Sequence, residues 1–215
     1  MRSRLCAAAV IALALTVLPV GCGSKSPDYK SIWTKTTTTA TSTEAPVPFA
    51  QYLESSGVTG EAVAPDKLTD LTVSIPVPPG WEKVEKPGIP ATTEMIAKDG
   101  KIPTAMLLVF KLNGEFDAAD VVKHGNADAR LAENFKLLDQ SGANFNGFPS
   151  SMIEGSYDLK GERMHTYNRI VLATGPAPAR QRYLVQLSVT SLAQQAAPDA
   201  ADIQAIIHGF TVAAK

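Results

Sequence analysis

Cysteine is nearly absent from this chain of 215 residues, which has only two, Cys6 and Cys22. Two cysteines cannot build a disulfide-rich scaffold, so a folded domain here must depend on a hydrophobic core. A basic excess is missing as well, because 20 Lys and Arg residues stand against 21 Asp and Glu residues. The sequence therefore lacks the electrostatic footprint of a nucleic-acid binder, and we expect no nucleic-acid partner.

Common catalytic motifs are also missing. The chain has no P-loop, Gly-x-Gly-x-x-Gly, His-Glu-x-x-His, Cys-x-x-Cys or Gly-x-Ser-x-Gly sequence. Its three histidines, His124, His165 and His208, are far apart, whereas zinc ligands commonly include some at short spacing. We expect no catalytic residues, no metal, no cofactor and no enzymatic activity.

The amino-terminal segment is typical of an export signal. Arg2 and Arg4 make it positive, and an apolar stretch over residues 5–20 follows, interrupted only by Thr16 and Pro19. Its unbroken part is about 11 residues, shorter than the roughly 20 that a membrane-spanning helix needs. We therefore expect residues 1–21 to be a signal peptide that is removed. No second long apolar run follows it.

Cys22 marks the expected cleavage point. Residues 18–25, Leu-Pro-Val-Gly-Cys-Gly-Ser-Lys, place small residues directly before a cysteine and resemble a bacterial lipobox. The resemblance implies a thioether between Cys22 and diacylglycerol, cleavage before Cys22 and acylation of the new amino terminus. Lipoboxes prefer Leu where this chain has Pro19, so an ordinary secretory signal with an incidental cysteine is the alternative. Because two or three acyl chains anchor a protein stably, we expect membrane attachment through Cys22.

Residues 22–48 are predicted to be a flexible tether that begins at the lipidated cysteine. Half of residues 31–48, nine of 18, are Ser or Thr, and such a tract buries too little apolar area to offset its ordering entropy. About 25 flexible residues span roughly 25–30 Å, enough to hold a domain off a membrane. Tyr29, Ile32 and Trp33 are unusual in a tether; they are either incidental or dock on the domain or the bilayer.

Residues 49–215 are expected to form one domain, since a chain of this size hides about 70% of its unfolded surface. Apolar spacing predicts a short helix around Tyr52 that ends at Gly57. Alternating or continuous apolar runs predict strands over residues 71–77, 92–98, 102–112, 153–159, 163–173 and 182–190. Short turns between strands require antiparallel pairing. We therefore predict an α+β fold with a single antiparallel sheet of about six strands and flanking helices.

Two further helices are predicted. Asp117 and Asp120 begin the first, which has one apolar stripe made of Val121, Leu131, Phe135 and Leu138. The second begins at Pro198-Asp199 and turns Ile203, Ile206 and Ile207 inward before it ends at Gly209.

Each histidine has a structural reading beside a functional one. His124 lies near the stripe of the middle helix, at a core edge or on the surface. His165 shares a strand face with Tyr167 and Arg169, which is either a ligand-binding surface or the solvated side of the sheet. His208 lies in the last turn of a helix, where a protonated imidazole interacts favourably with the helix dipole.

Other candidates are carboxylate pairs and aromatic residues. The pairs Asp117/Asp120 and Asp199/Asp202 fit the first turns of helices, where negative charge is stabilising, better than catalysis. Trp81 is expected to anchor the core rather than to form a ligand platform. The segment with Phe145, Phe148 and Pro149 forms either the rim of an apolar groove or a packed hairpin lip.

Five segments together resemble the mycobacterial LpqN/LpqT lipoproteins over essentially the whole mature domain. They are residues 52–53, 77–81 (Val-Pro-Pro-Gly-Trp), 147–157, 182–190 and 206–212 (Ile-Ile-His-Gly-Phe-Thr-Val). The resemblance implies a PsbP/Mog1-like fold on the outer side of the plasma membrane and a role in mycolate-rich envelope biology or host contact. It carries over no catalytic residue.

Three functions follow from these observations. The first is a lipid-anchored, non-catalytic binding or adaptor module that docks other envelope proteins. The second is a carrier that holds an acyl chain or envelope glycolipid in an apolar cavity of about 300–1,000 Å³. The third is a hydrolase with a dispersed active site that uses His165 or His124.

Overall fold

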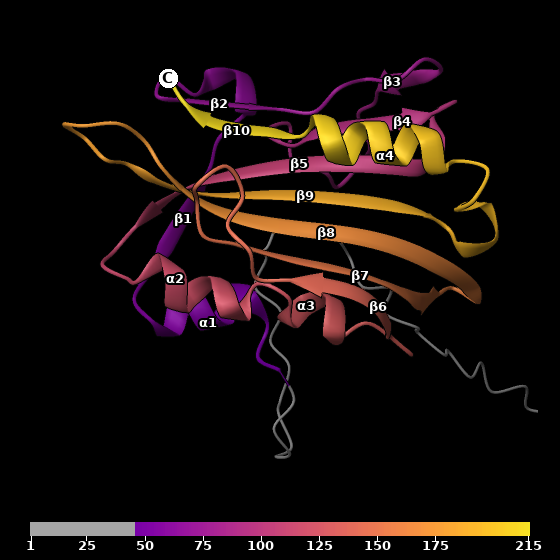
Figure 1. Ribbon diagram of the computed structural model, residues 1–215, viewed down its shortest axis with the longest axis horizontal. Helices are drawn as coiled ribbons and strands as arrows, with labels where there is room; N and C mark the ends of the chain where they lie inside the picture. Colours follow the sequence, from indigo (N-terminus) through magenta and orange to yellow (C-terminus); the bar gives the residue numbers. More distant parts are fainter. Residues whose placement is uncertain (1–45) are drawn as a thin grey trace, which may run out of the picture.

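A strand of 13 residues, β5 (Lys101–Asn113), runs through the centre of the fold (Figure 1). The structure is a computed structural model that describes residues 46–215. The predicted signal peptide, Cys22 and the tether as far as residue 45 lie outside the described residues. Residues 103–110 of β5 are all buried, because the sheet is covered on both faces. This explains the continuous apolar run, which is typical of strands without a solvated side.

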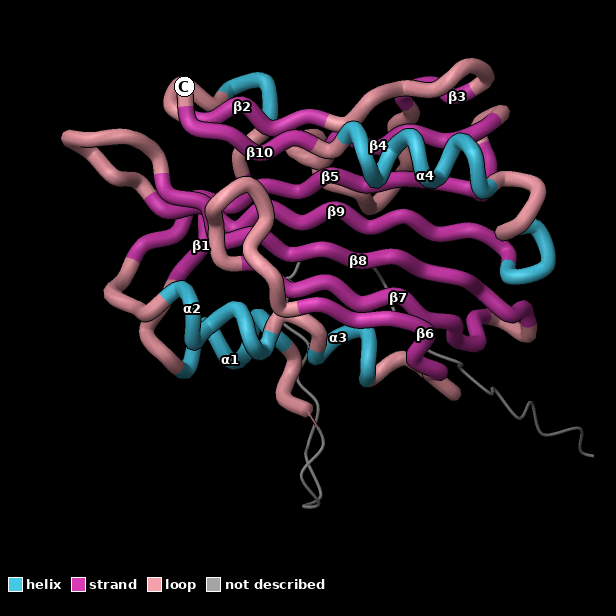
Figure 2. Tube along the Cα trace, in the orientation of Figure 1, coloured by secondary structure: helices cyan, strands magenta, loops and turns pink. Residues whose placement is uncertain are grey.

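Helices and strands of the described chain are distinguished by colour in Figure 2. The α-helices are α1 (Phe49–Ser55), α2 (Ala118–Val121), α3 (Ala127–Arg130) and α4 (Ala200–Gly209), and 3₁₀ turns cover Pro65–Lys67, Val122–His124 and Ala193–Gln195. The strands besides β5 are β1 (Thr59–Ala62), β2 (Leu71–Ser74), β3 (Trp81–Lys83), β4 (Glu94–Lys98), β6 (Lys136–Ser141), β7 (Ser150–Leu159), β8 (Glu162–Thr174), β9 (Arg182–Leu192) and β10 (Thr211–Ala214).

Eight strands form the main sheet, in the order β3-β4-β5-β9-β8-β7-β6, with β1 pairing beside β4 on β5. Strands β2 and β10 form a separate two-stranded ribbon. Every pairing is antiparallel, as the short turns required. The α+β class is confirmed, whereas six strands in a single sheet was an underestimate. The strands that were missed, β1, β3, β6 and β10, are short and mostly exposed.

Two apolar layers sandwich the sheet. On one face, α4 and the β2–β10 ribbon pack against alternate residues of β5 and β9, including Leu107 and Val185. On the other face, α1 and α2 cover the intervening residues, including Leu108 and Leu184. Figure 1 shows α4 and the ribbon beside β4 and β5, with α1, α2 and α3 beside β6 and β7. Helices α1, around Tyr52, and α4, the last helix, form where the sequence predicted them.

The long helix predicted after Asp117 is wrong in extent. Asp117 does cap a helix, because its Oδ1 accepts the N–H of Ala119 at 2.8 Å. That helix, α2, ends at Val121, and only a 3₁₀ turn and the short α3 follow. The backbone leaves the helical region at Asn126 (φ −92°, ψ 4°) and again at Asn134, which has a positive φ of 50°. Between them the segment lies close to β7, since a Cβ at Gly125 would be 2.4 Å from the Ser151 hydroxyl, and Leu138 lies on β6 instead.

Candidate functional site

The start of α4 is joined to the β3–β4 hairpin by a polar cluster. Lys98 Nζ at the end of β4 donates to Asp199 Oδ1 at 3.0 Å and to Asp202 Oδ2 at 2.9 Å. The indole N–H of Trp81 also donates to Asp202 Oδ2, at 3.2 Å. Trp81 itself is buried, so it anchors the core as predicted. The pair Asp199/Asp202 lies in the first turn of α4 as predicted, and both carboxylates are used to hold Lys98.

These contacts shift the ionisation of the cluster. The hydrogen bond from Lys98, and after it the one from Trp81, lowers the pKa of Asp202. The same contacts raise the pKa of Lys98, with Asp202 as the largest cause and Asp199 as the next. Both shifts favour the charged forms, so the ion pair is present across the neutral pH range.

We expect the Lys98–Asp202 pair to make the protein sensitive to acid. A carboxylate with a lowered folded pKa adds stability that is present above its unfolded pKa, about 4, and is lost as the pH falls through the folded value. As the pH falls from about 5 to about 2, the thermal unfolding midpoint of Asp202→Asn should therefore decrease less than that of the wild type. Thermal unfolding followed by circular dichroism across this range measures it, and parallel curves for both proteins would contradict it.

An open depression of about 420 Å³ lies beside this cluster. It is lined by the turn between β4 and β5 and by the approach to α4: Lys98, Asp99, Lys101, Ile102, Pro103, Gln195, Pro198 and Asp199. The lining contains no histidine, cysteine, serine or threonine. It therefore offers charge, amide and apolar contacts to a bound molecule, and its only ionisable side chains are Lys98, Lys101, Asp99 and Asp199, of which Lys98 and Asp199 are paired with each other. The sequence interpretation missed Lys98 and Lys101, whose only sequence signal was their place at the ends of two predicted strands.

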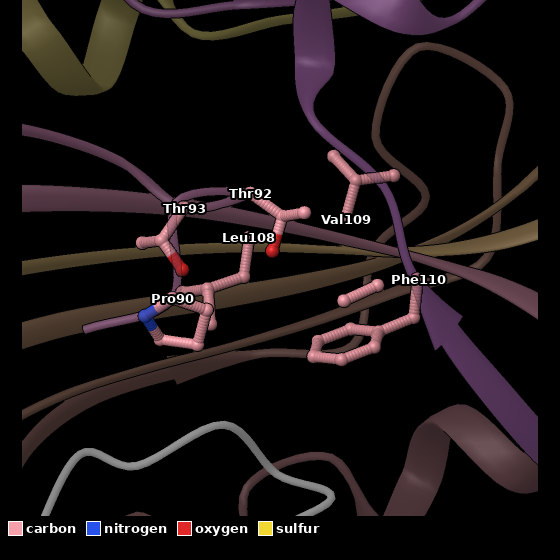
Figure 3. A pocket seen from close by; sticks show the side chains of 7 residues that line it. Pro90, Thr92, Thr93, Leu108, Val109 and Phe110 are labelled. Atoms are coloured by element: carbon pink, nitrogen blue, oxygen red, sulfur yellow. The ribbon is translucent and has the colours of Figure 1, made fainter. Parts of the chain in front are cut away.

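A much smaller cavity lies between β5 and the loop before β4 (Figure 3). Its volume is about 10 Å³, and Pro90, Thr92, Leu108 and Phe110 contribute to its lining. A cavity needs about 10–15 Å³ to hold one water molecule. This space is therefore far too small for an acyl chain.

The three histidines lie apart from this depression. The ring of His124 stacks on Tyr52 of α1, with centroids 3.7 Å apart, and His124 is exposed. His165 Nε2 lies 2.8 Å from Glu154 Oε1, on the β7–β8 pair. His208 is exposed in the last turn of α4, the position that favours a cation. Among residues 46–215, no group of three or more His, Cys, Asp and Glu side chains is placed to hold a metal ion.

The face that His165 shares with Tyr167 and Arg169 is covered by the loop before β7. Arg169 donates from Nε to the Tyr167 hydroxyl at 2.7 Å, and its guanidinium lies 5.0 Å from the centre of the Phe145 ring. Phe145 in turn stacks on Phe210, with centroids 5.0 Å apart. The residues around Phe145 thus form a packed lip over the core and not the rim of a groove.

Comparison with known proteins decides the family. A family model described as "Probable lipoprotein LpqN" matches residues 45–213. The chain is 61% identical over 212 residues to the protein named lipoprotein LpqT of Mycobacterium tuberculosis, which covers 97% of this chain and 94% of that protein. The chain belongs to the LpqN/LpqT lipoprotein family. The resemblance found in its sequence is confirmed.

One solved structure, that of LpqN, shares the fold. The crystal structure of LpqN, described as involved in cell envelope biogenesis of M. tuberculosis, aligns with a TM-score of 0.64 at 20% identity. It covers 76% of this chain and 95% of the LpqN chain. Cyanobacterial PsbP and yeast Mog1p align with TM-scores of 0.43 and 0.40.

Family membership marks the chain as an envelope-related lipoprotein and implies membrane association. In the part of the chain that the structure describes, no helix has both the length and the apolar character needed to cross a bilayer.

Proposed function

We propose that this LpqN/LpqT family member is a lipid-anchored, non-catalytic binding module on the outer face of the plasma membrane. Its anchor is a diacylglyceryl group on Cys22, and residues 22–48 tether a single domain over residues 49–215. The domain docks other envelope proteins. Family membership and the lipobox-like residues before Cys22 support the anchor.

The observation that carries the binding role is the composition of the depression beside α4. Its volume, about 420 Å³, lies within the range of about 300–1,000 Å³ typical of ligand sites, and its lining combines charged, amide and apolar side chains without a hydroxyl, thiol or imidazole group. Lys101 and Ile102 are both exposed beside it and offer a charge and an apolar contact to a partner. Asp199, one of the two carboxylates of the lining, is held by Lys98 Nζ at 3.0 Å.

The carrier alternative finds less support. The enclosed space beside β5 is about 10 Å³, and both faces of the sheet are filled by buried side chains such as Leu107 and Leu108. An acyl chain bound inside the domain would need a cavity many times larger than this one. The relation of LpqN to envelope biogenesis is a property of that protein, and it agrees with a role here in the same compartment.

Site-specific photo-crosslinking in intact mycobacterial cells tests the docking role. A photoreactive residue in place of Lys101, at the depression, should yield discrete adducts with envelope proteins. The same residue in place of Lys160, exposed on the β7–β8 turn, is the matched control and should yield about tenfold less. A chain limited to residues 1–48 controls for the tether. Adducts equal at both positions, or none above the tether control, would contradict the proposal.

A further inference from the structure

The edge strand β6 exposes apolar side chains. Among the described residues β6 is paired on one side only, by β7, and it ends the main sheet. Leu137 and Leu138 on this strand are 44% and 62% exposed, and Leu131, just after α3, is 43% exposed. The Arg130 guanidinium at the end of α3 donates to Gln140 Oε1 on β6, so α3 and the neighbouring Leu131 border this strand (Figure 1). A free strand edge with exposed apolar residues is a template for pairing with another chain.

A β-bulge gives this edge an unusual symmetry. Lys136 pairs with Ser156, and Asp139 pairs with Glu154. The two residues on β7 are two positions apart, whereas the two on β6 are three positions apart. Leu138 is the extra residue of the bulge. In a regular strand, side chains three residues apart point to opposite faces. The bulge therefore brings Lys136 and Asp139 to the same face of the sheet, and Leu137, opposite Gly155, lies on the other face.

We propose that β6 is a homodimerisation edge, at which two copies of this chain pair antiparallel about a two-fold axis. The axis passes between Leu137 and Leu138, so each Leu137 meets the partner's Leu138. On the opposite face, each Lys136 meets the partner's Asp139.

The sequence Lys136-Leu137-Leu138-Asp139 favours a second copy of this chain as the partner, because the sequence is complementary to itself. A two-fold interface uses the same patch on both copies, so a cation and an anion must lie at equal distances from the axis. Asp139 Oδ1 accepts the N–H of Gln140 at 2.8 Å, and within residues 46–215 its Oδ2 has no hydrogen-bond partner. Lys136 Nζ likewise has no hydrogen-bond partner in the described part of the chain. Each pair therefore forms without breaking a hydrogen bond that the structure shows, while Lys136 also lies near enough to Asp158 to help lower the pKa of that carboxyl.

The proposed pairing is limited to two copies of the chain. Once two β6 strands meet, the outer edge that remains at each end of the joined sheet consists of β3, which has three residues, and β1, which has four. An edge that short is a poor template for a third copy, so the contact ends at a dimer and not at a fibre. The dimer stands independently of the proposed docking site beside α4, which lies near the opposite border of the sheet.

Cysteine crosslinking of the full chain in intact cells tests the dimer. The exposed Leu138 lies next to the axis, so Leu138→Cys should give a crosslinked band at twice the mass of the chain with a short bismaleimide. Ser55→Cys, exposed on α1 and outside the proposed pairing edge, is the matched control and should give none. The parent chain shows whether Cys22 reacts by itself. A reactive Cys22 would contradict the lipid anchor and not the dimer, which is scored by the difference between the Leu138→Cys and Ser55→Cys chains.

Charge reversal identifies the register. In the Leu138→Cys chain, Lys136→Asp or Asp139→Lys alone should lower the dimer band about fivefold, because each places like charges opposite one another twice. The two changes together should restore it. A reversal without effect, a double variant as poor as the single ones, or a Leu138→Cys band no stronger than the Ser55→Cys band overturns the proposal. So does an adduct at the mass of a different protein, since β6 would then pair with that protein.

Discussion

Replacing Cys22 by serine is expected to move more than about nine-tenths of the protein out of the membrane fraction. A serine hydroxyl cannot form the thioether through which diacylglycerol would be attached. Each buried methylene of an acyl chain contributes about 0.8 kcal/mol, so the loss of two or three chains removes nearly all of the binding free energy. Among the described residues no membrane-spanning helix remains to replace the anchor.

Cell fractionation followed by blotting measures this result, and Cys6→Ser is the matched control. Cys6 lies within residues 1–21, the predicted signal peptide, so its replacement should leave the protein in the membrane fraction. Metabolic labelling with palmitate should mark the wild type and Cys6→Ser but not Cys22→Ser. If Cys22→Ser stayed in the membrane fraction at the wild-type level, the anchor would have to be another part of the molecule.

Replacing Trp81 by alanine is expected to lower the free energy of unfolding by about 3–5 kcal/mol. The indole is 6% exposed and packs in the core formed by α4, the β2–β10 ribbon and the sheet. Alanine would leave a cavity there and remove the hydrogen bond to Asp202. Because whole domains are stable by only about 5–15 kcal/mol, this loss is a large part of the total.

Urea unfolding followed by far-ultraviolet circular dichroism measures the effect without depending on tryptophan fluorescence. Trp81→Phe keeps most of the apolar volume and loses the N–H, so it should cost about 1–2 kcal/mol. Asp202→Asn keeps the indole in place and tests the ion pair alone. Equal losses for Trp81→Ala and Trp81→Phe would show that the hydrogen bond, and not the buried ring, gives Trp81 its importance.

The sequence predicted well those elements whose side chains face a core. The run at residues 105–110 predicted the central strand β5, and the triplet Ile203, Ile206 and Ile207 predicted α4. The short gap between the predicted strands 153–159 and 163–173 predicted a tight reversal, and there Lys160 and Gly161 both have positive φ, 53° and 83°. In each case periodicity or turn chemistry is local, so neighbouring residues contain the whole signal.

The errors arise where distant contacts decide the local structure. Leu131, Phe135 and Leu138 fit a helical stripe, but Asn134 has a positive φ of 50° and the chain from Lys136 onward pairs with β7 instead. Gly155 on β7 leaves room for this pairing, because a Cβ there would lie 2.4 Å from the Phe135 ring and 2.7 Å from the carbonyl of Lys136. The polar cluster of Lys98, Asp199 and Asp202 joins residues about a hundred positions apart, a pairing that no local pattern could indicate.

The β2–β10 ribbon sets an order of events for a newly made chain. Polypeptides emerge amino end first, yet Val73 pairs with Val212, and the N–H of Lys215 donates to the Asp70 carbonyl at 3.0 Å. The apolar side chains of Leu71 and Val73 consequently stay uncovered until residues 211–214 have been made about 140 positions later. A chain that stopped before residue 211 would lack this layer of its interior, and the ribbon would be left with one strand.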